Sequence, residues 1–96
     1  MMVYYLNREK RVLMMTLDHV KVRRKAYVAE ISGGRGVHGH LNTLGIHVGD
    51  ELTVIERAPF SGPLLVEIHG TRVALGRGIA AKVRVKVDGH LESLTE

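Results

Sequence analysis

The sequence KVRVKV occupies Lys82–Val87 and alternates a cationic residue with valine at every position. Successive side chains of a β-strand point to opposite faces, so this period of two predicts a strand with a buried valine face and a basic outer face. A similar alternation occurs in LLVEI at Leu64–Ile68, and Gly70 turns the chain back into TRVAL at Thr71–Leu75. These two segments are typical of a β-hairpin, so three strands are predicted in this half of the chain.

Two more strands are predicted upstream. Glu51–Arg57 (ELTVIER) mixes β-branched and polar residues, as a half-buried strand does. Ala26–Ile31 has a similar character and stops at the turn formed by Ser32, Gly33 and Gly34. The total is five short strands.

One short helix is predicted between the strands at 26–31 and 51–57. Val37, Leu41 and Leu44 fall at i, i+4 and i+7, which places them on one helical face. Gly45 follows as a left-handed cap.

The predicted fold is mainly β: a small barrel of about five strands with one short helix. Short strands with one buried face must curl or close to cover their edges, and the helix would close one mouth of the barrel. We expect the barrel at residues 14–87. Residues 1–13 are expected to form an extension that is either disordered or strand-like, and residues 88–96 an acidic tail.

The amino-acid composition excludes several classes of protein function. The chain has 96 residues and no cysteine, which fits one small domain without disulfides, thiol nucleophile or iron–sulfur cluster, in a reducing cytoplasm. It has no run of about 18 apolar residues, so membrane insertion is not expected. Its net charge is +4, and residues 1–40 hold eight Lys/Arg against three Asp/Glu. This basic front could meet nucleic acid, anionic lipid or an acidic protein.

No enzyme motif is present, because the chain lacks the P-loop, nucleophile-elbow and HExxH patterns. We therefore expect no catalytic residues. Among six histidines, His38 and His40 are two residues apart and His47 lies just beyond the helix cap. On a helix, side chains two apart diverge by about 200°, which weakens this pair as a site. These three histidines are the metal-ligand candidates, for a divalent transition metal such as Fe²⁺, or Zn²⁺ or Mn²⁺ in its place.

Nucleic-acid binding is an alternative with less support. The cationic residues of the last strand, Lys82, Arg84 and Lys86, could join the basic front. The chain has only three tyrosines and one phenylalanine, however, and stacking on aromatic rings is what single-strand platforms use.

The segment between the strands at 51–57 and 64–68 is a loop stiffened by Pro59 and Pro63, with the sole phenylalanine, Phe60, at its tip. Two interpretations are open. Phe60 is either an exposed anchor for a partner's pocket or a lid folded back over the barrel.

Three motifs in order resemble the ferrous-iron transport protein A (FeoA) family: LNTLGIHVG at 41–49, RAPFSGPL at 57–64 and VALGR at 73–77, followed by Ala80. The resemblance covers about residues 15–87. It implies an SH3-like barrel and a cytoplasmic accessory protein that acts on FeoB, the membrane G-protein transporter of ferrous iron. It also implies protein–protein contact rather than enzyme activity, and no required cofactor.

The contact residues expected from this reading are Leu44, Arg57, Pro59, Phe60 and Pro63. A metal-responsive regulator that uses the histidines and a basic nucleic-acid binder are the alternative functions. A homo-oligomer is a further prediction, formed through an exposed barrel edge or the strand-like N-terminal extension.

Overall fold

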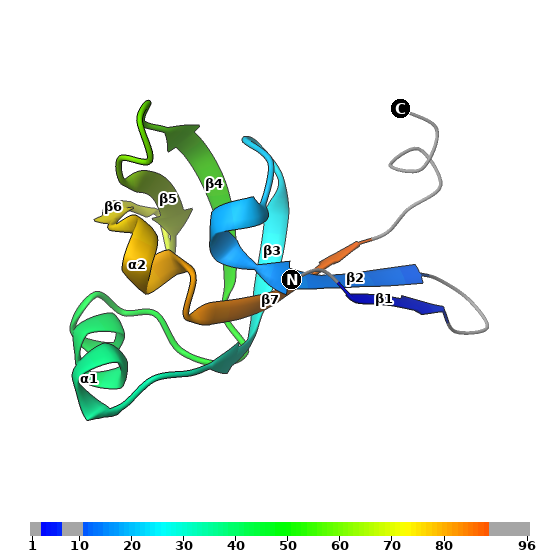
Figure 1. Cartoon of the computed structure of the whole chain (residues 1–96), viewed down its shortest axis with the longest axis horizontal. Helices are drawn as coiled ribbons and strands as arrows, with labels where there is room; N and C mark the ends of the chain where they lie inside the picture. Colours follow the sequence, from blue (N-terminus) through cyan, green and yellow to red (C-terminus); the bar gives the residue numbers. More distant parts are fainter. Residues whose placement is uncertain (1–2, 7–10, 89–96) are drawn as a thin grey trace.

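The computed structural model describes residues 3–6 and 11–88 of the chain (Figure 1). Within them, the strands are β1 (Val3–Leu6), β2 (Arg11–Thr16), β3 (Lys25–Ile31), β4 (Glu51–Arg57), β5 (Leu64–Ile68), β6 (Thr71–Leu75) and β7 (Val83–Asp88). The helical elements are the 3₁₀ turn η1 (Leu17–His19), helix α1 (Arg35–Thr43) and the single turn α2 (Arg77–Ala80). None of these helices is long and apolar enough to cross a membrane.

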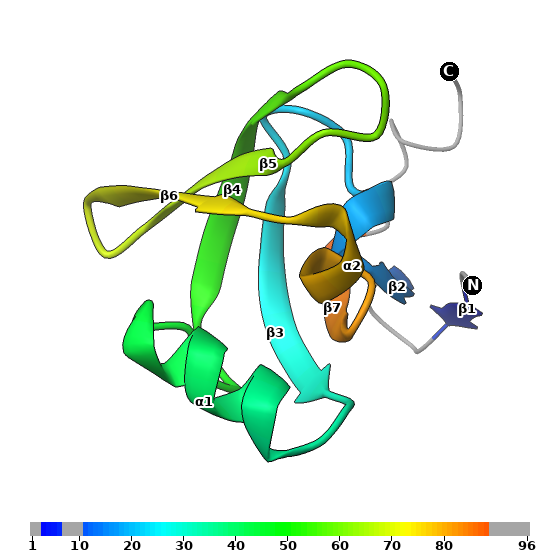
Figure 2. The same cartoon turned by 60° about the vertical axis from the view of Figure 1, so that its left-hand side comes forward.

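The strands form one antiparallel sheet in the order β1-β2-β7-β3-β4-β5-β6. The sheet curls strongly, so that β5 and β6 cross in front of β4 and β3 (Figure 2). β7, the last strand in the sequence, lies near the middle, between β2 and β3. The curled sheet is the predicted SH3-like barrel.

The five predicted strands are confirmed. The segment predicted at 51–57 coincides with β4, and the predicted hairpin is β5–β6. Its two-residue turn has both His69 (φ 53°) and Gly70 (φ 76°) in the left-handed region, which matches the right-handed twist of the flanking strands. The last predicted strand is displaced by one residue and runs over Val83–Asp88.

Two strands were not in the count of five. β2 pairs with β7, with Leu13 opposite Val87 and Met15 opposite Val85, and β1 pairs with β2. Residues 11–13, assigned above to the extension, therefore belong to the sheet, and Val3–Leu6 takes the strand-like alternative. The acidic tail predicted for residues 88–96 lies outside the described residues except for Asp88, which ends β7.

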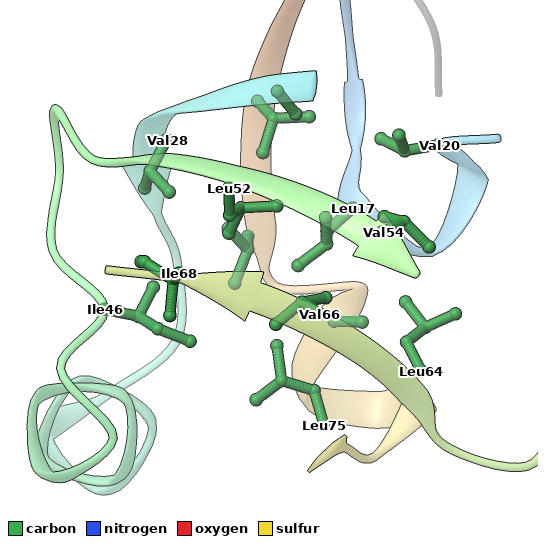
Figure 3. Close-up of a cluster of buried hydrophobic side chains, with 14 of the residues drawn as sticks. Leu17, Val20, Val28, Ile46, Leu52, Val54, Leu64, Val66, Ile68 and Leu75 are labelled. Carbon is green, nitrogen blue, oxygen red and sulfur yellow. The ribbon is translucent and has the colours of Figure 1, made fainter. Parts of the chain in front are cut away.

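The core is aliphatic, and among the described residues no polar or charged residue is buried. The inward faces of β3, β4, β5 and β7 supply most of it. The remaining residues come from β2, β6, the helical elements η1, α1 and α2, and the segments after η1 and α1. Figure 3 shows side chains from these elements pointing toward one another. The labelled residues are Leu17, Val20, Val28, Ile46, Leu52, Val54, Leu64, Val66, Ile68 and Leu75.

The alternation in the last strand gives the predicted faces. Val83, Val85 and Val87 are buried, whereas Arg84 and Lys86 are exposed. This agrees with the rule that successive strand side chains point to opposite sides of a sheet.

Helix α1 packs against one end of the barrel through the face that was predicted. Leu41 is fully buried, and Val37 and Leu44 are half-buried against the core. Gly45 adopts the left-handed conformation (φ 82°) just beyond the helix. The amide of Ile46 then donates to the carbonyl of Leu41 at 2.9 Å, which satisfies a carbonyl at the helix end.

Candidate partner-binding site

The loop between β4 and β5 is closed by two backbone hydrogen bonds. The amide of Ala58 donates to the carbonyl of Pro63, and the amide of Gly62 donates to the carbonyl of Pro59, both at 3.0 Å. A Cβ on Gly62 would lie 2.8 Å from the Cβ of Ala58, so the close approach requires glycine. The loop therefore has a defined shape.

Phe60 is at the tip of this loop and is fully exposed (100%). The structure excludes the alternative in which this ring folds back as a lid. Phe60 (φ 58°) and Ser61 (φ 59°) are both left-handed, which costs L-residues roughly 1 kcal/mol each. Neither the left-handed backbone nor the exposed apolar ring stabilises the isolated domain, which makes Phe60 the candidate anchor of this site.

The other predicted contact residues divide into two groups. Pro59 and Pro63 are exposed on the same loop as Phe60. Leu44 follows α1, which lies at the end of the barrel opposite the β4–β5 loop (Figure 2), and is half-buried in the core. The structure therefore does not bring Leu44 to the Phe60 surface.

Arg57 contacts its own chain. Its Nη1 donates to the carbonyl of Val20 at 2.6 Å, and its Nη2 donates to the carbonyl of Asp18. The side chain is partly buried and binds the η1 turn to the end of β4. Arg57 thus positions the loops at this end of the barrel, in place of the free partner contact expected from the sequence.

The metal-ligand candidates are distributed over a helix and a loop. His38 and His40 are exposed on α1, and His47 lies in the α1–β4 loop. Among the residues described, no group of three His, Asp or Glu side chains is placed to hold a metal ion. A metal site that uses these histidines stays a prediction.

His47 belongs instead to a polar cluster centred on Asp50, which sequence reasoning missed. The amide of His47 donates to Oδ2 of Asp50 at 2.8 Å, and the His47 Nδ1 lies 3.3 Å from the same oxygen. Oδ1 of Asp50 lies 3.4 Å from Nε2 of His69 in the β5–β6 turn. The spacing of His47 and Asp50 was a readable turn signal, but nothing local points to His69.

These contacts alter the pKa of Asp50. Partial burial raises this pKa, but the hydrogen bond from the His47 amide and the contacts with His69 and His47 lower it more, so that it lies below its ordinary value of 3.8. A carboxyl whose pKa is depressed by folding stabilises the protein above its unfolded pKa. That stabilisation is lost as the pH falls through the folded pKa.

We therefore expect Asp50→Asn to flatten the loss of stability in acid. The free energy of unfolding of the wild type, measured in urea, should fall as the pH drops below about 4. The difference in this free energy between wild type and variant should close in the same pH range. Glu56→Gln, which changes an exposed carboxylate on β4, is the control and should keep the wild-type profile. If the free energies of unfolding of Asp50→Asn and wild type differed by the same amount at every pH, the lowered pKa of Asp50 would be contradicted.

The basic outer face of β7 is partly neutralised within the sheet. Nη1 of Arg84 lies 3.7 Å from Oε1 of Glu30 on β3. Nζ of Lys25 on the same strand lies 3.4 Å from Oε2 of Glu51. These pairs reduce the field available to a phosphate backbone, so the structure adds no support for nucleic-acid binding.

A curled antiparallel sheet with an aliphatic core defines a small SH3-like domain, and the loop between β4 and β5 is exposed on it. The FeoA domain model matches residues 15–87, which is most of the chain. The chain belongs to the FeoA family.

Similar proteins of known sequence or structure support this family assignment. The chain is 33% identical over 73 residues to "Putative Fe(2+) transport protein A" of Methanocaldococcus jannaschii, covering 76% of this chain and 87% of that protein. It matches the crystal structure of an iron uptake regulatory protein (FeoA) with a TM-score of 0.70 and 29% identity, covering 77% of this chain and 97% of the other. It also matches a manganese-dependent transcriptional repressor with a TM-score of 0.72 and 25% identity, covering 77% of this chain but 41% of the repressor.

Proposed function

We propose that this chain is a cytoplasmic accessory protein of ferrous-iron uptake that binds the cytoplasmic G-protein region of an FeoB-type transporter and assists or regulates it. Membership of the FeoA family and the name of the M. jannaschii relative support the role in iron uptake. The observation that carries the binding role is the fully exposed ring of Phe60 on a loop closed by two hydrogen bonds.

The binding mechanism follows from the shape of this loop. Phe60 enters an apolar pocket of the partner, and the exposed rings of Pro59 and Pro63 cover the border of that pocket. Because two backbone hydrogen bonds already fix the shape of the loop, little conformational entropy is lost on association. Aromatic anchors of this kind commonly supply a large part of the binding energy of an interface. The chain contributes contact and requires no bound cofactor for it.

Phe60→Ala is expected to weaken binding to the transporter's cytoplasmic region by about 30-fold or more, the loss typical of an interface hot spot. Its free energy of unfolding should stay within about 0.5 kcal/mol of wild type, because the exposed ring makes no core contact and alanine keeps the same backbone constraint. Titration calorimetry and urea unfolding measure the two effects.

The matched control is Val48→Ala. Val48 is also exposed (61%), but it lies in the α1–β4 loop, away from Phe60. This variant should bind like wild type. Equal affinities for wild type and Phe60→Ala would sink the assignment of Phe60 as the anchor.

A further inference from the structure

We infer that the binding surface has a second half, the basic turn of residues 20–24 between η1 and β3, and that it selects a protein partner whose apolar pocket is bordered by carboxylates. The inference rests on the proposed function and adds the chemistry of the partner. The turn belongs to the basic front of residues 1–40, but none of its residues was among the contact residues expected from the sequence.

Backbone hydrogen bonds place this turn beside the Phe60 loop. The amide of Arg23 donates to the carbonyl of Val54 at 2.5 Å, and the amide of Val54 donates to the carbonyl of Arg24 at 3.3 Å. Three residues further along β4, Arg57 holds the carbonyl of Val20 at 2.6 Å. The turn therefore runs along the last half of β4.

The Phe60 loop begins directly after Arg57, where β4 ends. Figures 1 and 2 both show this loop and the 20–24 turn at the same end of the barrel, away from α1. Two segments far apart in sequence thus present one surface, and Arg57 is its positioning residue.

The side chains of the turn have the composition of an interface border. Val22 is 41% exposed, and Lys21 and Arg23 on either side of it are exposed. Within residues 3–6 and 11–88, no ion pair engages the side chain of Lys21 or Arg23. Glu56 is the exposed carboxylate on the adjacent part of β4, so cations outnumber acids here.

This arrangement favours a protein pocket over a lipid surface. Attachment to a membrane scales with the apolar area that is buried, and here one aromatic ring and a half-exposed valine supply it. A single ring with nearby cations instead fits a pocket of similar size with an acidic border, where complementary charges accelerate association and fix orientation.

The test is a pair of charge reversals with equal change in net charge. Lys21→Glu/Arg23→Glu alters the turn, and Lys82→Glu/Lys86→Glu alters exposed lysines in and next to β7. Calorimetry with the FeoB cytoplasmic region should show affinity reduced by about tenfold or more for the first pair at low salt, and within about twofold of wild type for the second. The first pair should also lose most of the wild-type decrease in affinity between about 50 mM and about 300 mM salt.

Each other outcome overturns the inference in a distinguishable way. If Phe60→Ala loses binding while both double charge-reversal variants bind like wild type, the proposed function is supported. The inference that the partner's pocket has an acidic border is then wrong. If both pairs weaken binding equally, the attraction is general and not confined to the turn. If wild type does not bind the FeoB region, the proposed function fails and the inference with it. Co-sedimentation with phosphatidylserine vesicles in that last case would assign the surface to lipid.

Discussion

Leu41→Ala is expected to lower the free energy of unfolding by about 3 kcal/mol, because it removes a fully buried side chain and leaves a cavity under α1. The helix has little stability of its own. It contains Gly36 and Gly39, each costing about 1 kcal/mol relative to alanine, and its N-cap residue, Gly34, makes no side-chain capping bond. Docking through Leu41 is therefore what holds α1 in place.

Leu44→Ala is the matched control, since it removes the same atoms from a half-buried position at the end of the same helix. We expect it to cost roughly half as much, about 1.5 kcal/mol, in urea unfolding. The far-ultraviolet circular dichroism of Leu41→Ala should also lose helical signal before the main transition. Equal losses for the two variants would contradict the packing described for α1.

Arg57→Ala is expected to lower the free energy of unfolding by about 2 kcal/mol, because two charge-assisted hydrogen bonds disappear from a partly buried position. The carbonyls of Val20 and Asp18 lose their donors, and the η1 turn loses its attachment to β4. Because Arg57 positions both segments of the binding surface, partner affinity should fall as well, without any direct contact by the guanidinium.

Arg57→Lys separates charge from geometry. Lysine keeps the positive charge but cannot reach two carbonyls with a planar fork, so an intermediate loss of stability is expected. Glu56→Ala, on the neighbouring exposed residue, should stay within about 0.5 kcal/mol of wild type. If Arg57→Lys is as stable as wild type, one of the two hydrogen bonds contributes nothing.

Local sequence patterns were enough to predict most of the elements. β4, the β5–β6 hairpin and α1 have clear periods bounded by glycine or proline, and the left-handed Gly45 lies where the helix pattern ends. β2 escaped prediction because it has four consecutive apolar residues, 12–15, with no alternation. Met15 is buried and the three before it are half-buried, so the strand has no polar face that would mark its period.

The proposed binding surface depends on contacts that no local pattern specifies. Arg57 and Val20 are 37 residues apart, and nothing in the sequence around Arg57 indicates that its guanidinium holds the η1 turn. The same holds for Asp50 and His69, which meet only because the hairpin turn folds toward the α1–β4 loop. Phe60 was singled out by its place at the tip of a loop with two prolines, but its left-handed conformation and full exposure required the structure.

The position of β7 between β2 and β3 has a consequence for synthesis of the protein. During translation, strands β2 and β3 leave the ribosome long before β7, which lies between them in the sheet. Neither strand can pair with β7 until residues 83–88 emerge. Folding is therefore dominated by contacts between distant parts of the chain, which slows it. Until then, two strand edges stay open to wrong partners, and a ribosome that stalls before Val83 releases a sheet without its centre.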